Sequence, residues 1–207
     1  MRIGIVGGTF DPVHLGHVAM AEAAAGCAGL DRVLLIPASR PPHRSAAMAP
    51  AANRLAMCRL AAAGHPGLEV SDIELRRPGP SYTVDTLRAL AAQRPDDELY
   101  LVLGWDAARE LRAWRSPAAV MRLARLVVVT RPGYARPGPA DLAAAGIDPD
   151  RALLCDARTP DVDSTDIRRL AETGASLAGL VDPAVEAYVR GHALYAPPAA
   201  GSPAKGA

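Results

Sequence analysis

Short, continuous apolar runs recur along the chain and are separated by longer stretches with helical patterning. Apolar residues that follow one another without polar alternation are typical of strands buried on both faces of a parallel sheet. Residues 68–76 instead alternate between apolar and polar types, which predicts a strand with one solvated face. The predicted strands are the run from Ile3 to Val6, then Asp31–Pro37, Leu68–Arg76, Glu98–Gly104, Leu123–Thr130 and Ala152–Cys155.

Helical patterns lie between these strands. Ser81 and Thr83 stand at the start of one such pattern, where hydroxyl side chains are good helix N-caps. Alternating strands and helices predict an α/β protein with a doubly wound parallel sheet, right-handed crossovers and a small C-terminal helical part. The predicted helices follow His14, span Ala51–Ala63, run from Ser81 to about Gln93, begin at Asp163 and span Pro183–Arg190.

Length and composition predict one domain. Residues 1–195 form the predicted domain, and residues 196–207, rich in Pro, Ala and Gly, are predicted to be a disordered tail. Half of the chain (50%) is hydrophobic, which is enough for a sizeable core. The formal net charge of +1 gives no electrostatic reason to expect nucleic acid or a membrane as a partner, and the oligomeric state stays open.

The three cysteines, Cys27, Cys58 and Cys155, stand far apart in the sequence. This scatter predicts neither a disulfide framework nor a metal cluster. It is typical of a protein in a reducing compartment, so we expect a cytoplasmic location.

The segment Gly7–His17 combines a glycine turn with two histidines at the predicted start of a helix. Backbone N–H groups and the helix dipole favour a bound anion such as phosphate at this point. His14 and His17 are three residues apart, so they can share a helix face. They could also form half of a zinc site, which would need a third ligand, or be ordinary structural side chains; no metal site is predicted.

Further chemistry-bearing segments follow the other predicted strands, where open α/β sheets bind ligands. Loop 41–44 could clamp a phosphate or be a solvated basic loop, and its residues alone slightly favour the solvated loop. Trp114 is a packing anchor or a stacking plate, and its spacing alone favours packing. The segments are Pro41-Pro42-His43-Arg44, Ser81–Thr86, Gly104-Trp105-Asp106, Arg131-Pro132-Gly133-Tyr134 and Asp163–Arg168.

Gly7–His17 resembles the signature of the nucleotidyltransferase superfamily whose motif ends in H-x-G-H. The order of the later segments is similar to that of bacterial nicotinate-nucleotide adenylyltransferases over Met1 to Tyr195. The resemblance implies a Rossmann-like fold and transfer of the adenylyl group of ATP to nicotinic acid mononucleotide, with Mg²⁺ as the partner of ATP. This chain departs from the family at Asp163, where serine is usual.

The resemblance also implies roles for individual residues. His14, His17 and Arg168 would be catalytic and would stabilise the phosphates. Asp106 would bind the nucleotide sugar, and Trp114 would stack on the nicotinate ring. The implied ATP-binding residues are Gly8, Thr9, Phe10, His14, His17, Gly104, Asp106, Arg131, Ser164, Thr165 and Arg168, and the implied substrate-binding residues are His43, Arg44, Thr83 and Trp114.

Two other functions remain open at this point. The chain could be a sister adenylyltransferase that acts on nicotinamide mononucleotide or on phosphopantetheine. It could also be a non-catalytic nucleotide-binding module, although both histidines and Arg168 are present.

Overall fold

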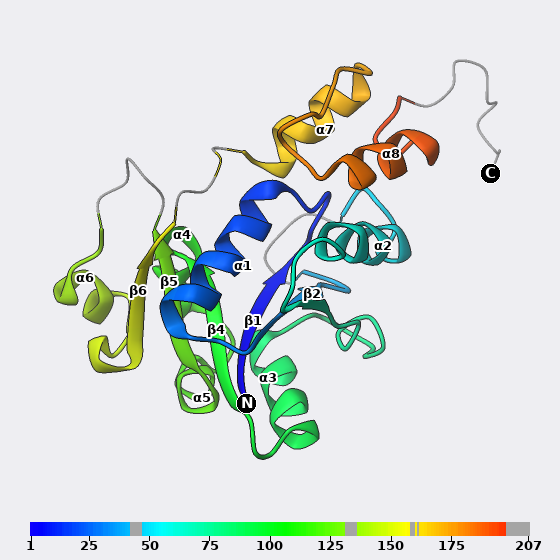
Figure 1. The fold of residues 1–207 in the computed structure, drawn as a ribbon. Helices are drawn as coiled ribbons and strands as arrows, with labels where there is room; N and C mark the ends of the chain where they lie inside the picture. Colours follow the sequence, from blue (N-terminus) through cyan, green and yellow to red (C-terminus); the bar gives the residue numbers. More distant parts are fainter. Residues whose placement is uncertain (42–46, 131–135, 158–159, 161, 198–207) are drawn as a thin grey trace.

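A six-stranded, all-parallel sheet forms the centre of the protein (Figure 1). The computed structural model describes residues 1–41, 47–130, 136–157, 160 and 162–197. The strand order is β3-β2-β1-β4-β5-β6, so the chain winds outward from β1 on one side and then on the other, which confirms the predicted doubly wound sheet. The strands are β1 (Arg2–Gly8), β2 (Arg32–Pro37), β3 (Leu68–Val70), β4 (Glu98–Gly104), β5 (Arg125–Thr130) and β6 (Ala152–Asp156).

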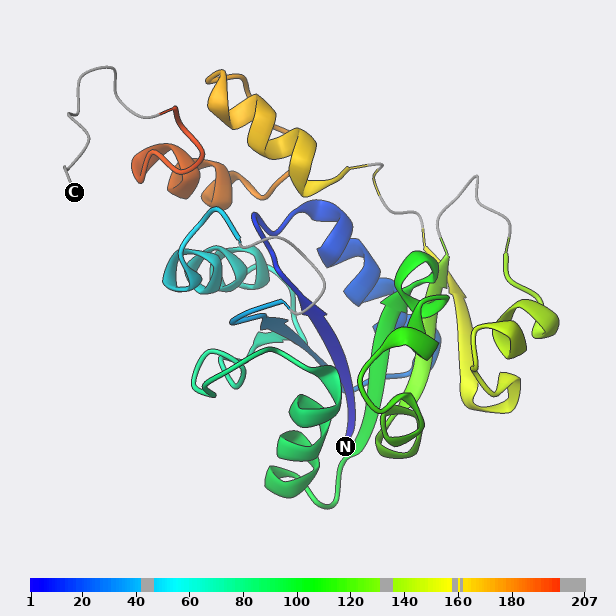
Figure 2. The same cartoon turned by 180° about the vertical axis from the view of Figure 1, so that it is seen from behind.

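Helices cover both faces of this sheet (Figures 1 and 2). α1 and α2 pack on one face, and α3 and α5 pack on the other. α7 and α8 form the predicted C-terminal helical part, beyond the carboxyl end of β1 (Figure 1). The helices are α1 (Leu15–Ala28), α2 (Ala51–Ala62), α3 (Thr83–Gln93), α4 (Trp105–Ala108), α5 (Pro117–Leu123), α6 (Pro139–Ala144), α7 (Ser164–Glu172) and α8 (Pro183–Gly191), with short 3₁₀ turns η1 (Leu111–Ala113) and η2 (Pro149–Arg151).

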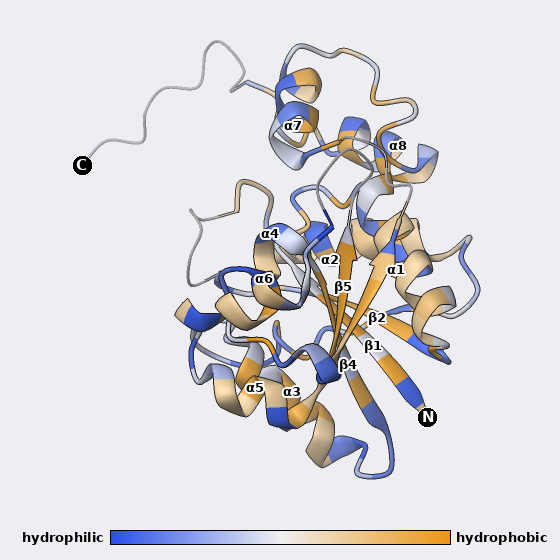
Figure 3. Cartoon of the chain, turned by 90° about the vertical axis from the view of Figure 1, so that its left-hand side faces the viewer, coloured by the Kyte–Doolittle hydropathy of each residue, from blue (hydrophilic) through white to orange (hydrophobic). Residues whose placement is uncertain are grey.

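The strands supply two hydrophobic cores, one on each face of the sheet. In β4, Leu99 and Leu101 point into the core with α3 and α5, whereas Tyr100 and Val102 point into the core with α1 and α2. Successive side chains of a strand point to opposite faces, so an all-apolar run fills both cores. Figure 3 shows these apolar strands enclosed by helices that also carry hydrophilic residues.

The predicted strand at 68–76 is too long, because β3 ends at Val70. The N–H groups of Leu75 and Arg76 both donate to the carbonyl of Asp72, at 2.9 and 3.1 Å, and close a turn. Glu74 is buried and accepts a hydrogen bond of 2.6 Å from the Thr86 hydroxyl. The apolar–polar alternation therefore comes partly from a turn that buries a carboxylate, and not from a solvated strand face.

The cysteine prediction is also wrong, because Cys27 and Cys155 form a disulfide. They are 128 residues apart in sequence, but their Cα atoms are 5.9 Å apart, since the end of α1 lies against β6. Cys58 is a free, buried thiol whose pKa is raised by burial. The cytoplasmic location stays a prediction.

Among the described helices, none is long and apolar enough to cross a membrane. Residues 198–207 of the predicted tail lie outside the described part of the chain, so its disorder stays a prediction.

Candidate active site

The loop between β1 and α1 forms the floor of the candidate site. Phe10 has a φ of 50°, a conformation that bulky residues rarely adopt. Its ring is 1% exposed and meets the His17 ring edge to face, with 4.9 Å between the centroids. Burial of this ring offsets the cost of the unusual backbone conformation.

His14 and His17 lie together at the start of α1. Their rings stack with centroids 3.7 Å apart, and the backbone N–H of His14 donates to Nδ1 of His17 at 3.3 Å. A neutral His17 with Nδ1 as acceptor carries its proton on Nε2, so the ring stays a hydrogen-bond donor. A Cβ on Gly16 would lie 3.0 Å from Nδ1 of His14, so a larger residue at this position would crowd the His14 ring.

The N-terminus of α7 is attached to the same loop. Arg168 donates from Nη1 to the carbonyl of Asp11 at 2.8 Å and from Nη2 to the Thr165 hydroxyl at 3.3 Å. The Ser164 hydroxyl donates to the carbonyl of Pro12 at 3.0 Å. The structure therefore brings together the two predicted phosphate-binding helix starts, which are about 150 residues apart in sequence.

Asp163 caps α7 with its own carboxylate. One carboxylate oxygen accepts hydrogen bonds from the backbone N–H groups of Thr165 at 2.6 Å and Asp166 at 2.9 Å. These N–H groups lower the pKa of the Asp163 carboxyl below its usual 3.8, and the nearby His14 and Arg168 lower it further. An ionised carboxylate thus stands at a helix start where phosphate binding is predicted.

Thr83 and Trp114 lie on the opposite side of the sheet from α1. Thr83 is the first residue of α3, and Trp114, which follows η1, packs half-buried against the same core as Tyr82. The guanidinium of Arg115 lies 4.5 Å from the centre of the Tyr82 ring. The start of α3 and the segment around Trp114 are therefore neighbours, as a shared ring pocket would need.

The predicted capping roles of Ser81 and Thr83 are wrong, since Thr83 is the first residue of α3 itself. The N-cap of α3 is Tyr82, and no side chain caps the helix. The Ser81 hydroxyl instead accepts a hydrogen bond of 2.8 Å from the backbone N–H of Ser39, and the Ser81 N–H donates to the carbonyl of Arg40 at 2.9 Å. These bonds join the start of α3 to the loop that follows β2.

Gly104 and Asp106 occupy the carboxyl end of β4. Gly104 is the last residue of β4 and the N-cap of α4. The Asp106 side chain is 70% exposed, and its carboxylate lies 3.9 Å from Nη2 of Arg109. An accessible carboxylate at the end of a central strand is available to the hydroxyl groups of a bound sugar. The other predicted side chains, His43, Arg44 and Arg131, lie outside the described residues.

Three buried polar residues in or next to the loop have no role assigned from the sequence: Asp11, Arg54 and Tyr195. Asp11 accepts a hydrogen bond from the Tyr195 hydroxyl at 2.8 Å, and Arg54 donates to the carbonyl of Thr9 at 2.7 Å. One signal for Arg54 is its helical spacing to Met57, which places it on the buried face of α2. No sequence signal joins Tyr195 to Asp11.

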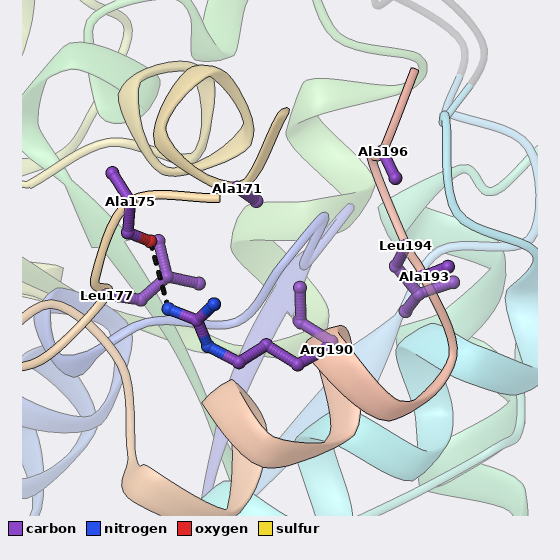
Figure 4. A pocket seen from close by; sticks show the side chains of 8 residues that line it. Ala171, Ala175, Leu177, Arg190, Ala193, Leu194 and Ala196 are labelled. Atoms are coloured by element: carbon purple, nitrogen blue, oxygen red, sulfur yellow. Dashed lines mark hydrogen bonds between the residues drawn. The ribbon is translucent and has the colours of Figure 1, made fainter. Parts of the chain in front are cut away.

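In the described part of the chain, no three His, Cys, Asp or Glu side chains gather to hold a metal ion. A cavity of about 250 Å³ lies between α7 and α8 and is lined by apolar residues and Arg190, which donates to the carbonyl of Ala175 at 3.1 Å (Figure 4). None of the predicted site residues that the structure describes lines this cavity. It is therefore a feature of the C-terminal helical part and not of the candidate site.

Comparison with known proteins agrees with this geometry. A cytidylyltransferase-like family model matches residues 5–170. A probable nicotinate-nucleotide adenylyltransferase of Synechococcus sp. is 46% identical over 95% of this chain and 96% of its own, and one from Thermus thermophilus is 45% identical over 94% of this chain and 100% of its own.

Among solved structures, a Plasmodium falciparum nicotinic acid mononucleotide adenylyltransferase complexed with NaAD superposes with a TM-score of 0.77. It shares 16% identity with this chain, covering 94% of this chain and 97% of its own, so it supports the fold alone. The relatives carry the assignment, because their identity extends over nearly the whole of both chains. The chain belongs to the nicotinate-nucleotide adenylyltransferase family.

Proposed function

We propose that this chain transfers the adenylyl group of ATP to nicotinic acid mononucleotide, forming nicotinic acid adenine dinucleotide and pyrophosphate for NAD biosynthesis. One structural observation carries the proposal: the starts of α1 and α7 meet at one loop through the bonds of Arg168 and Ser164 to the carbonyls of Asp11 and Pro12. Near the carboxyl end of β1, this arrangement places two helix N-termini, two imidazoles and a guanidinium, which are groups that bind a polyphosphate well. The names of the similar relatives support the same reaction.

In this reaction, an oxygen of the mononucleotide's phosphate attacks the α-phosphorus of ATP. A new P–O bond forms while the bond from the α-phosphorus to the bridging oxygen breaks, and the electron pair leaves with pyrophosphate. The attacking phosphate is already anionic near neutral pH, so the reaction needs no protein nucleophile. The protein must bring two anions into line and stabilise the charge that develops.

His14 and His17 are the proposed donors to the α- and β-phosphates. Arg168, with Ser164 and Thr165, is proposed to hold the β- and γ-phosphates. A guanidinium has five N–H donors, so Arg168 can keep its bond to the Asp11 carbonyl and still donate to a phosphate.

The remaining proposed contacts surround the two nucleotides. The backbone of Gly8, Thr9 and Phe10 would approach ATP closely, and Asp106, after Gly104, would bind its sugar. Thr83 and Trp114 would frame the nicotinate ring, with Trp114 stacked on it. The other proposed contacts come from His43 and Arg44 to the mononucleotide and from Arg131 to ATP.

Mg²⁺ is proposed to enter as part of the Mg-ATP substrate. Phosphate oxygens and water are its preferred ligands when it is bound with a triphosphate. The carboxylate of Asp11 accepts bonds from the protein itself, and so does that of Asp163, which suits this arrangement.

The test is pyrophosphate release from Mg-ATP with nicotinic acid mononucleotide, nicotinamide mononucleotide or phosphopantetheine, with the product identified by mass spectrometry. We expect kcat/KM for the acid to exceed that for either alternative by about tenfold or more, a difference of about 1.4 kcal/mol in transition-state binding. Equal or better use of the amide, or activity only with phosphopantetheine, would overturn the substrate assignment. ATP binding without turnover of any acceptor would favour a nucleotide-binding module.

A further inference from the structure

Asp11 lies at the centre of a buried hydrogen-bond network beneath the candidate site. Its side chain is 4% exposed and accepts three hydrogen bonds. The donors are the backbone N–H groups of Met48 at 2.7 Å and Ala49 at 3.0 Å, and the Tyr195 hydroxyl at 2.8 Å. Because a buried carboxylate needs such donors, these bonds hold Asp11 in one orientation.

Arg54 joins the loop after β1 to the segment that holds Met48 and Ala49. Its side chain is 2% exposed, and it donates from Nη1 to the carbonyl of Thr9 at 2.7 Å and from Nε to the carbonyl of Ala49 at 3.2 Å. Burial lowers the pKa of the Arg54 guanidinium, and the nearby Asp11 carboxylate opposes this shift. The buried cation and anion thus stabilise each other while each bonds to backbone groups of the loops.

The network joins three segments, of which the first and the third are proposed to bind ATP. The first is the loop after β1, which holds Asp11 itself. The second is the loop after β2, which returns at Met48 and Ala49. The third is α7, where Arg168 donates to the backbone carbonyl of Asp11 at 2.8 Å.

Tyr195 attaches the end of the described C-terminal part to this point. It is 9% exposed and has a φ of 65°, which is unusual for tyrosine. Burial, followed by the neighbouring Asp11 carboxylate, raises the pKa of the Tyr195 hydroxyl, so it stays protonated and donates. Tyr195 thus adopts an unusual backbone conformation while its buried hydroxyl donates a hydrogen bond to Asp11.

We propose that Asp11, Arg54 and Tyr195 are positioning residues that hold the loop after β1 and the start of α7, the two segments proposed to bind ATP, in place before ATP arrives. This inference rests on the proposed function, and it assigns none of the three side chains a contact with substrate. A preformed site spends less binding free energy on ordering its own loops. Weakening the network therefore weakens ATP binding in addition to lowering stability.

The test compares Tyr195→Phe with a matched control, Tyr100→Phe. Both substitutions remove one hydroxyl from a largely buried tyrosine that donates to a carboxylate, because Tyr100 donates to Glu98 at 2.9 Å. Tyr100 lies on β4 near its amino end, away from the candidate site. Mg-ATP is the probe, and the measurements are its Kd by calorimetry, the melting temperature with and without it, and the KM for ATP.

We expect Tyr195→Phe to weaken ATP binding by about fivefold, with a matching rise in the KM for ATP and a kcat within about twofold of the wild type. Both variants lower the melting temperature of the free protein. The stabilisation that ATP adds is reduced only in Tyr195→Phe, because a purely structural hydroxyl would change both liganded and free forms equally. Asp11→Asn keeps the shape of the side chain and should show a larger effect in the same direction.

Equal ATP affinity in wild type, Tyr195→Phe and a folded Asp11→Asn would overturn the inference. A similar loss of ATP affinity in Tyr100→Phe would overturn it too, because the effect would then follow stability and not position. ATP binding is measured without an acceptor, so a wild-type chain that binds ATP but forms no dinucleotide refutes the proposed function alone. A wild-type chain that does not bind ATP refutes both.

Discussion

Asp163 places a negative charge at a helix start that is proposed to receive part of a triphosphate. Its carboxylate accepts the N–H groups of Thr165 and Asp166, which are the groups a phosphate oxygen would use. Replacing Asp163 with Ser removes the charge but keeps a good N-cap, since Asp and Ser cap helices about equally well. We therefore expect Asp163→Ser to bind ATP more tightly, with little change in folding.

The size of the effect follows from Coulomb's law. We take a separation of about 8 Å between the carboxylate and the nearest phosphate charge. Two unit charges at that distance repel each other by about 2 kcal/mol at an effective dielectric constant of about 20, and by about 0.5 kcal/mol at that of water. Asp163 is exposed, which favours the lower part of this range. The KM for ATP should thus fall by between about twofold and thirtyfold, and the exposure of Asp163 favours a fall close to twofold.

The assay is the KM for ATP at low and high salt in the wild type, Asp163→Ser and Asp163→Asn. Asn keeps the shape of the side chain and the cap without the charge, so both variants should gain affinity if charge is the cause. The gain should shrink at high salt, because exposed charges are screened over about 8 to 10 Å. An unchanged or higher KM in both variants at low salt would refute the reasoning and show that the Asp163 carboxylate does not oppose ATP.

Three further predictions concern stability and turnover. The lowered pKa of Asp163 means that its charged cap adds stability above pH 3.8 and loses it as the pH falls through the folded-state value. Urea unfolding should therefore show the stability of wild type falling relative to that of Asp163→Asn as the pH drops below 3.8. A difference that stays constant with pH would contradict this. His17→Ala should lower kcat by about a hundredfold or more. The control His192→Ala changes an exposed histidine at the end of α8 and should keep the wild-type rate. Near-normal turnover in His17→Ala would remove the role assigned to His17. The disulfide closes a loop of 128 residues, so a reducing agent should lower the free energy of unfolding of the wild type by about 4 to 5 kcal/mol. The stability of Cys27→Ser should not change on reduction. A wild type whose stability is insensitive to reduction would contradict the pairing of Cys27 with Cys155.

The elements of the fold could largely be predicted from the sequence, because their signals are local. The run at Glu98–Gly104 predicts β4 with the observed bounds, and the strand at 31–37 differs from β2 by one residue. The segment from Gly7 to His17 predicts a strand, a turn and a helix start, since glycine, proline and apolar periodicity act within a few residues. The strand predicted at 68–76 is longer than β3 because the turn that buries Glu74 has the same apolar–polar alternation as a strand.

The same holds for the site, where the types of the predicted residues could be read from the sequence but their bonds could not. Arg168 and Ser164 were predicted as phosphate ligands, but the sequence does not show that they also hold the carbonyls of Asp11 and Pro12. Ser81 was predicted as a helix cap because hydroxyls favour that position, yet Ser39 offers its hydroxyl a partner from another segment.

By itself, therefore, the sequence determined the order of strands and helices, the motifs that identify the family and the chemistry of the candidate site. Only the tertiary structure decided which distant groups meet: Cys27 with Cys155, and Asp11 with Tyr195. The physical reason is that sequence patterns report on neighbours within a strand or a helical turn, whereas these pairs are 128 and 184 residues apart and meet only once the sheet and its helices have packed.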